Sequence, residues 1–146
     1  MNALPVVLDS AGLSAASEAK PPARLRALLA EAYARGSDVI VPAVICAEVC
    51  RGVARTRGVE TLVTRKLPDN SGNRAIALAE TDFTLARQVG AVLAGAGVGS
   101  EYIADAHVVA VCAQHGGGMV ITSDPHDITR LAATVPSARI VVRAPD

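Results

Sequence analysis

The stretch Pro5-Val6-Val7-Leu8-Asp9 decides the fold, because a short apolar run closed by a carboxylate is typical of a buried strand that leads into a site. A second stretch, Met119-Val120-Ile121-Thr122-Ser123-Asp124, follows the same design near the other end of the chain. In open α/β sheets, sites form beyond the carboxyl ends of the strands. The pattern therefore places Asp9 and Asp124 at that edge of a sheet, although it does not by itself bring the two side chains together.

Strands and helices alternate along the rest of the chain. We expect strands over residues 6–9, 38–41, 75–78, 119–122 and 139–142, a loop over 68–73, and helices over 11–19, 23–34, from 42 through 48, 61–66, 82–93, 103–114 and 127–133. Such alternation predicts an α/β layer fold with a mostly parallel sheet of about five strands. The length of 146 residues is about that of one domain, so we assign residues 1–146 to a single domain.

Composition narrows the class of protein further. Hydrophobic residues make up 51% of the chain, but only two Tyr and one Phe are aromatic, so the core must consist of Ala, Val, Leu and Ile. Cys46, Cys50 and Cys112 fit no common disulfide or zinc pattern. The N-terminus lacks the basic region of a signal peptide, and no apolar stretch is long enough to span a bilayer. A cytoplasmic protein without membrane attachment is therefore expected.

The charge balance does not exclude a polyanionic substrate. The chain carries 14 basic and 14 acidic residues, but if four acids held cations, only 14 − 4 = 10 acids would face the 14 bases. Most of the bases are Arg, whose planar side chain grips phosphate oxygens. Arg51 begins a locally basic segment that runs to Lys66, which indicates either a site that holds an RNA backbone or a solvated helical face.

Two further carboxylates interrupt apolar helices. Glu48 is the only charged residue between Ala43 and Cys50, and Asp105 lies at the start of the apolar run over 102–112. Each has a separate structural explanation: an ion pair between Glu48 and Arg51, and for Asp105 the macrodipole at the first turn of a helix. Asp9 and Asp124 also have one, because Asp commonly caps helices.

A shared divalent cation explains all four carboxylates at once. Two carboxylates about 4 Å apart repel by about 4 kcal/mol at an effective dielectric of about 20, so a cluster must hold cations, share protons or loosen. Oxygen ligands favour Mg²⁺ or Mn²⁺. Asp124 is preferred to Asp127 for the fourth position because it lies nearer the strand end. Residues expected to support the site or contact substrate are Ser10, Arg51, Thr122, Ser123 and Asp127.

The order of these motifs resembles the PIN-domain nucleases, and within them the VapC-type toxins of toxin–antitoxin pairs. The residues that carry the resemblance are Val7-Leu8-Asp9-Ser10-Ala11-Gly12-Leu13-Ser14-Ala15, then Val41-Pro42-Ala43-Val44 to Ala47-Glu48-Val49 and Arg51-Gly52, then Ala104-Asp105-Ala106 with Val108-Val109-Ala110, and finally Ile121-Thr122-Ser123-Asp124-Pro125-His126-Asp127-Ile128. Each motif is short, but four in this order across nearly the whole chain are fairly specific. Ser10 stands where many members have Thr, which keeps the hydroxyl.

The resemblance implies a three-layer sandwich in which helices flank a central sheet. It also implies that Asp9, Glu48, Asp105 and Asp124 converge as the metal site of a Mg²⁺- or Mn²⁺-dependent endoribonuclease. Such toxins are usually neutralised by a VapB-type antitoxin and usually form dimers. Because aromatic residues for base stacking are scarce here, we expect a structured RNA substrate of the tRNA, rRNA or mRNA class.

Two other functions compete with the nuclease hypothesis. The first is a non-catalytic PIN-like module that binds RNA or protein and keeps the acidic pocket for structural reasons. The second is a phosphatase or phosphotransferase that uses an aspartyl phosphate, since Asp9 follows a strand as that chemistry requires. The Asp-x-Asp pair of such enzymes is absent, because residue 11 is Ala.

Overall fold

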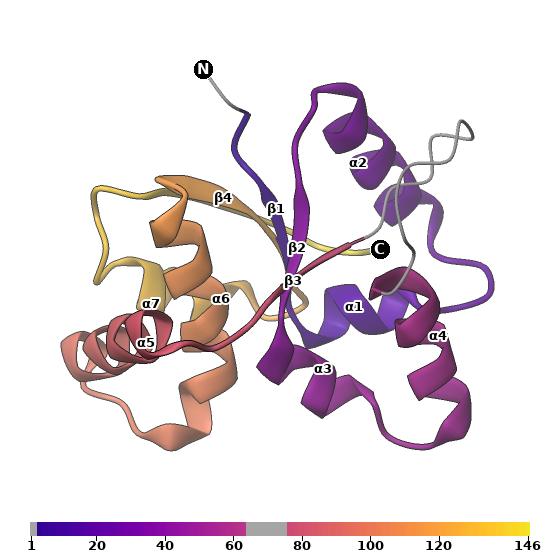
Figure 1. The fold of residues 1–146 in the computed structure, drawn as a ribbon. Helices are drawn as coiled ribbons and strands as arrows, with labels where there is room; N and C mark the ends of the chain where they lie inside the picture. Colours follow the sequence, from indigo (N-terminus) through magenta and orange to yellow (C-terminus); the bar gives the residue numbers. More distant parts are fainter. Residues whose placement is uncertain (1–2, 64–75) are drawn as a thin grey trace.

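A computed structural model describes residues 3–63 and 76–146 of the chain (Figure 1). The loop expected over 68–73 lies outside the described residues, as do Arg65 and Lys66 of the basic segment. The same holds for the second half of the helix expected over 61–66 and for the first residue of the strand expected over 75–78.

A sheet of five parallel strands forms the centre of the molecule, in the order β3-β2-β1-β4-β5. The strands are β1 (Val6–Leu8), β2 (Val39–Pro42), β3 (Ala77–Ala79), β4 (Gly117–Ile121) and β5 (Arg139–Arg143). The strand with the deciding sequence, β1, thus lies in the middle, between β2 and β4. The predicted α/β fold is confirmed, and the sheet is parallel throughout rather than mostly parallel.

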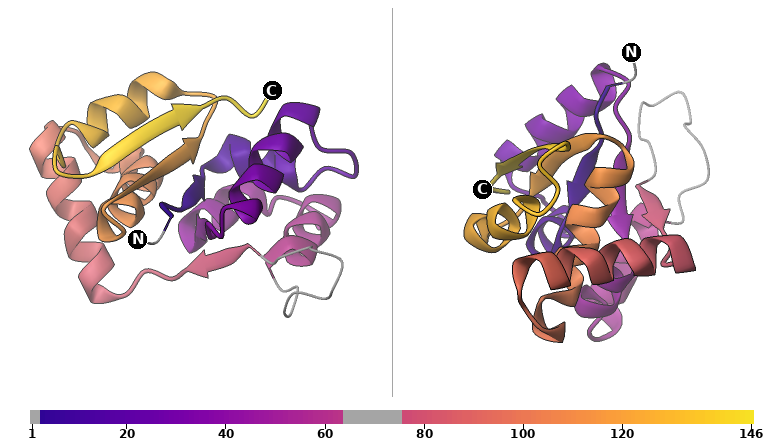
Figure 2. Two further views of the ribbon diagram at one scale, coloured as in Figure 1. Left: turned by 90° about the horizontal axis from the view of Figure 1, so that it is seen from above. Right: turned by 90° about the vertical axis from the view of Figure 1, so that its left-hand side faces the viewer.

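Helices cover both faces of the sheet and complete a three-layer sandwich (Figures 1 and 2). On one face lie α5 (Phe83–Ala96), α6 (Ile103–Gln114) and α7 (Pro125–Ala132), with a short 3-10 turn, η1 (Ser100–Tyr102), before α6. On the other lie α1 (Ser10–Ala16), α2 (Ala23–Ala34) and α4 (Val53–Val63), and α3 (Ala43–Val49) follows β2 and packs against α1.

The core is aliphatic, as the composition predicts. All three residues of β1 are fully buried, and Val108 through Cys112 of α6 are fully buried as well. A helix that is apolar around most of its circumference must be enclosed by other elements. Here α6 is enclosed by α5, α7 and the sheet strands β1, β2 and β4.

Gly12 allows α1 to begin directly against β4. A Cβ atom at this position would lie 2.9 Å from the carbonyl oxygen of Ile121 and 3.2 Å from its Cβ, closer than side chains pack. Just before this contact, the backbone N–H of Asp9 donates to the Ile121 carbonyl over 3.2 Å. The turn from β1 into α1 therefore holds Asp9 beside the end of the neighbouring strand.

The helix that carries Glu48 lies within one residue of the expected range but does not continue as far as Arg51. It ends at Val49, and Gly52 then adopts a φ of +89° before α4 begins at Val53. Arg51 therefore does not share a helical face with Glu48. Both residues are exposed. Among residues 3–63 and 76–146, no helix combines the length and apolar character needed to cross a membrane.

Candidate acidic metal site

Asp9 lies at the base of the candidate site, at the carboxyl end of β1. It is the N-cap of α1, where its Oδ1 accepts a hydrogen bond from the Gly12 N–H over 2.9 Å, and it is only 6% exposed. The Thr122 side chain also donates to this carboxylate. Burial raises the pKa of Asp9 above its ordinary value, the hydrogen bonds from Thr122, Gly12 and Ala11 lower it, and the charge of Glu48 raises it. The net pKa is raised, so burial outweighs the hydrogen bonds.

Thr122 connects Asp9 to the end of β4. Its Oγ1 accepts a hydrogen bond from the backbone N–H of Asp124 over 2.9 Å, and the same hydroxyl donates to the Asp9 carboxylate. Thr122 is 2% exposed, so this hydroxyl is held in a fixed position. The sequence analysis assigned it a supporting role from its place at a strand end, and its two partners are consistent with that role.

Asp124 and Asp127 act as a pair. Asp124 occupies the N-cap position of α7, but in the described structure its side chain makes no capping hydrogen bond. Instead it shares a hydrogen bond with the Asp127 carboxyl, which is the main reason why the pKa of Asp127 is raised; Arg130 and His126 act in the opposite direction. The two aspartates between which the sequence left a choice therefore lie close enough to interact.

Glu48 reaches the site from α3. The hydroxyl of Ser10 donates to its Oε2 over 3.1 Å, although the two residues are 38 positions apart in the chain. Across the described parts of the chain, no ion pair joins Glu48 to Arg51. The alternative explanation, an ion pair between Glu48 and Arg51, is therefore wrong. Because α3 ends at Val49, Arg51 does not lie one helical turn beyond Glu48.

Asp105 shows most directly that the carboxylates share one region. It lies in the first turn of α6 and is partly buried. Its pKa is raised from the ordinary 3.8 to about 6, first by burial and then by the charges of four carboxylates, Asp9, Asp127, Glu48 and Asp124. The residues that the sequence singled out from four separate stretches thus act on one another electrostatically. We call these five residues the acidic site.

The described side chains of the acidic site do not by themselves form a complete set of metal ligands. Within residues 3–63 and 76–146, no group of three or more His, Cys, Asp or Glu side chains is arranged to hold an ion. The donors are nevertheless all oxygen atoms, as hard cations prefer, and their mutual repulsion is the condition that a cation relieves. Mg²⁺ keeps several waters and is usually bound through one or two carboxylates, so the donor set fits this ion without three protein ligands.

The remaining residues expected near the site lie around it. Ser123 and Arg51 are exposed. Ser123 lines a surface hollow together with Thr122, Arg24 and Arg143. Arg55 donates to the hydroxyl of Ser14 in α1 over 3.1 Å, which places part of the basic segment against the helix that follows Asp9.

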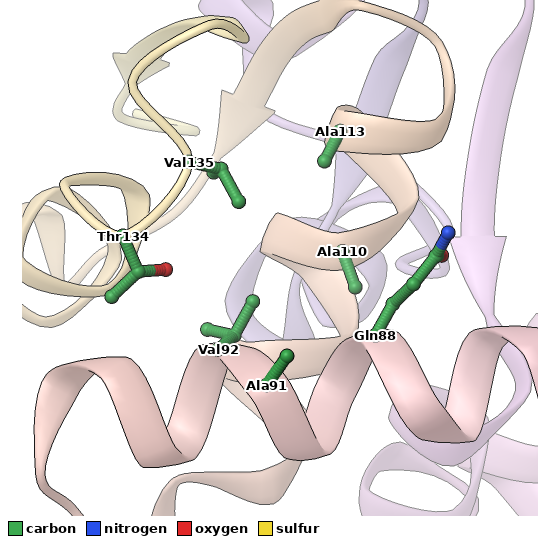
Figure 3. A pocket seen from close by; sticks show the side chains of 7 residues that line it. All are labelled: Gln88, Ala91, Val92, Ala110, Ala113, Thr134 and Val135. Atoms are coloured by element: carbon green, nitrogen blue, oxygen red, sulfur yellow. The ribbon is translucent and has the colours of Figure 1, made fainter.

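A separate apolar hollow has no part in the acidic site. It measures about 250 Å³ and lies between α5, α6 and the chain that follows α7 (Figure 3). It is lined by Gln88, Ala91, Val92, Ala110, Ala113, Thr134 and Val135. The aliphatic side chains point into it, while the Gln88 amide turns away from it and accepts a hydrogen bond from Gln114 over 2.8 Å. No titratable side chain lines this hollow, so it offers no group for metal or acid–base chemistry.

The raised pKa of Asp105 predicts a pH dependence of stability in the absence of metal. Because the folded protein holds this proton more tightly than the unfolded chain, the contribution of Asp105 to folded stability is most favourable below about pH 4 and is lost as the pH rises through about 6. After allowance for solvent screening, the loss is about 1–2 kcal/mol. Urea unfolding in EDTA should therefore show Asp105→Asn more stable than the wild type at neutral pH, with the gain shrinking towards about pH 4. A gain of the same size at every pH would contradict the assigned pKa.

A parallel α/β sheet with carboxylates gathered at the carboxyl ends of its central strands defines a class of proteins built around an acidic centre. The PIN domain family matches residues 6–133, and the chain belongs to this family. No curated protein sequence matches it closely. Two solved structures share the fold, at 20% and 19% sequence identity. One is FitAB bound to an IR36 DNA fragment, with a TM-score of 0.58 over 96% of this chain and 94% of that chain. The other is FitAcB from Neisseria gonorrhoeae, with a TM-score of 0.57 over 96% of this chain and 97% of that chain.

Proposed function

We propose that this protein is a metal-dependent endoribonuclease and the toxin of a VapBC-type toxin–antitoxin pair. The observation that carries the proposal is the convergence of Asp9, Glu48, Asp124 and Asp127 on Asp105, whose pKa they raise together with burial. A group of carboxylates that raises the pKa of one member is a candidate functional site, because a purely structural surface has no need to bear that repulsion. Membership of the PIN domain family supports the nuclease class.

Asp9 and Asp105 are the proposed direct metal ligands. Both are at least partly buried and both have a raised pKa, so both gain most from a nearby positive charge. Glu48, held by Ser10, and the pair Asp124–Asp127 complete the acidic site around them. When bound, Mg²⁺ or Mn²⁺ supplies an activated water and neutralises charge on the scissile phosphate.

The chain's own residues position these groups. Thr122 and the Gly12 N–H fix the Asp9 carboxylate in one orientation, so that little reorganisation is needed when substrate arrives. At the rim of the site, the hydrogen bond with Asp124 raises the pKa of Asp127 above its ordinary value.

The partners of the proposed toxin are an RNA substrate, a VapB-type antitoxin and a second copy of the chain. The basic residues Arg51, Arg55 and Arg57 are exposed on and before α4, on the side where α1 leaves the acidic site. Contacts of this kind position a nucleic-acid backbone without reading its sequence. The antitoxin and the homodimer rest on the resemblance to VapC-type toxins.

Metal removal tests the proposed function most directly. Mg²⁺ at about 100 times its dissociation constant should stabilise the fold by about 2.7 kcal/mol, which corresponds to a rise in melting temperature of roughly 5–10 °C. Cleavage of a structured RNA should require the added metal and stop in EDTA. Both can be measured on one preparation, by differential scanning fluorimetry and by gel analysis of RNA ends.

The same pair of measurements separates the nuclease from the non-catalytic alternative. A binding module with a structural acidic pocket would gain stability from Mg²⁺ and still leave RNA intact. Cleavage that continues in EDTA would sink the metal-dependent mechanism, and a melting temperature unaffected by Mg²⁺ or Mn²⁺ would remove the proposed metal site.

A further inference from the structure

A groove on the open part of the sheet carries three arginines. It measures about 360 Å³ and lies where the C-terminal end of α2 approaches β4 and β5. Arg139, Val141 and Arg143 alternate along β5, so they share one face of that edge strand. Met119, which pairs with Val141, lies in the floor, and Arg35 closes the groove from the end of α2. Among the described residues that line this groove, none is acidic.

The groove also contains a buried hydroxyl that lacks a partner. Ser37 is 1% exposed, and its Oγ makes no hydrogen bond with any described residue. A buried polar group without a partner costs free energy, so such groups are rare in folded proteins. A hydroxyl of this kind beside three arginines is a ready donor for an anionic oxygen.

The groove is connected to the acidic site through Arg143. This residue also lines the neighbouring hollow of about 650 Å³, together with Arg24, Thr122 and Ser123. Thr122 in turn donates to Asp9. The arginine track, which we define as Arg24, Arg143, Arg139 and Arg35, therefore leads from the acidic site to the amino ends of the strands. Asp146 is an acid that lines the hollow beside it.

The arginines of the track differ in whether their side chains already have a partner among the described residues. Arg35 forms an ion pair with Glu31 over 3.1 Å, and Arg143 donates from Nη1 to the Val142 carbonyl over 2.8 Å. Arg139 makes no ion pair within the described parts of the chain and is exposed. Arg139 is therefore the residue whose charge is most available to a ligand.

We propose that the RNA strand flanking the cleavage site runs along the arginine track, with one phosphate at Arg139 and the Ser37 hydroxyl. This inference rests on the proposed ribonuclease function. A succession of arginines that leads away from a phosphodiester-cleaving site suits a chain of phosphates better than a single small anion, because one anion needs only one of them. Backbone contacts of this kind give affinity and register, and the sequence of the RNA is not read by them.

The test measures RNA binding, so it does not depend on cleavage. A fluorescent RNA of about twelve nucleotides, within the range of single-strand site sizes, is titrated in EDTA at several salt concentrations with the wild type and with single variants. Arg139→Glu should weaken binding at least tenfold and make the salt dependence of log K shallower by about 0.7 for the lost phosphate contact. The matched control is Arg87→Glu, on α5 across the sheet, where the same charge change should leave the affinity within about twofold of the wild type.

Ser37→Ala provides a test without a change of charge. It should weaken RNA binding by about tenfold, the worth of a hydrogen bond to a charged group, while the melting temperature does not fall, because the removed hydroxyl has no partner in the described structure. Equal effects of Arg139→Glu and Arg87→Glu, or full affinity in Ser37→Ala, would overturn the proposal. The proposal would also be overturned if the Arg139→Glu variant lost binding to an oligoglutamate peptide but kept its binding to the RNA. Failure of the proposed function looks different: Mg²⁺-dependent cleavage would be absent even in the wild type.

Discussion

Asp9→Asn is expected to lower metal-dependent RNA cleavage by at least about 100-fold, the usual scale for losing one electrostatic group of a catalytic centre. The substitution removes the charge of a buried carboxylate at the carboxyl end of β1 and leaves the shape of the side chain almost unchanged. The fold should survive, because Asn caps a helix about as well as Asp and can still accept from the Gly12 N–H. Activity is measured by RNA cleavage at saturating Mg²⁺, and folding by circular dichroism and thermal melting.

Asp38→Asn is the matched control for this experiment. Asp38 is exposed and comes just before β2, at the opposite end of the sheet from the acidic site. The same chemical change there should leave cleavage near the wild-type rate. If Asp9→Asn retained more than about a tenth of the activity, Asp9 could not be a metal ligand of the reaction.

Gly117→Ala is expected to destabilise the protein by about 2–5 kcal/mol, from backbone strain and overpacking together. Gly117 begins β4 with a φ of +144°, a conformation that other residues rarely adopt. A Cβ atom there would press on the carbonyl oxygen of Arg139 and lie 2.9 Å from its backbone nitrogen. Both are atoms of the paired strand β5, so relief requires movement of the sheet itself. Urea denaturation measures the loss.

The neighbouring residue provides an internal comparison. Gly116 has a φ of +78°, but a Cβ atom there would meet nothing within 4 Å. Gly116→Ala should therefore cost only the backbone term, about 1 kcal/mol. Similar losses for the two variants would show that the contact with Arg139 is not what requires glycine at position 117.

Local pattern was enough to predict most of the elements. The bounds expected for 23–34 and 103–114 agree with α2 and α6, because helically spaced leucines define the first and a long apolar run defines the second. Either Thr81 or Asp82 could cap the helix expected to run through residue 93, and the structure selects Asp82, which accepts from the Leu85 N–H over 2.8 Å at the start of α5. The break between α3 and α4 was not predicted in detail: α3 ends at Val49, and Gly52 has a positive φ just before α4 begins at Val53.

The arrangement of the acidic site depends on contacts between distant residues. Sequence pattern placed Asp9 and Asp124 at strand ends, but the order of strands that makes β1 and β4 neighbours is a property of the whole sheet. The partner of Glu48 was missed for the same reason, since Ser10 lies 38 residues away. The pairing of Asp124 with Asp127 had one local signal, their spacing of three residues across the start of α7.

The central place of β1 has a consequence for synthesis of the protein. This strand is synthesised before the other four, yet one of its two neighbours, β4, follows more than a hundred residues later. Until β4 and β5 emerge, the nascent chain lacks two of its five strands together with Asp124 and Asp127. The acidic site therefore cannot assemble before Asp127 has been synthesised, when most of the chain has already left the ribosome.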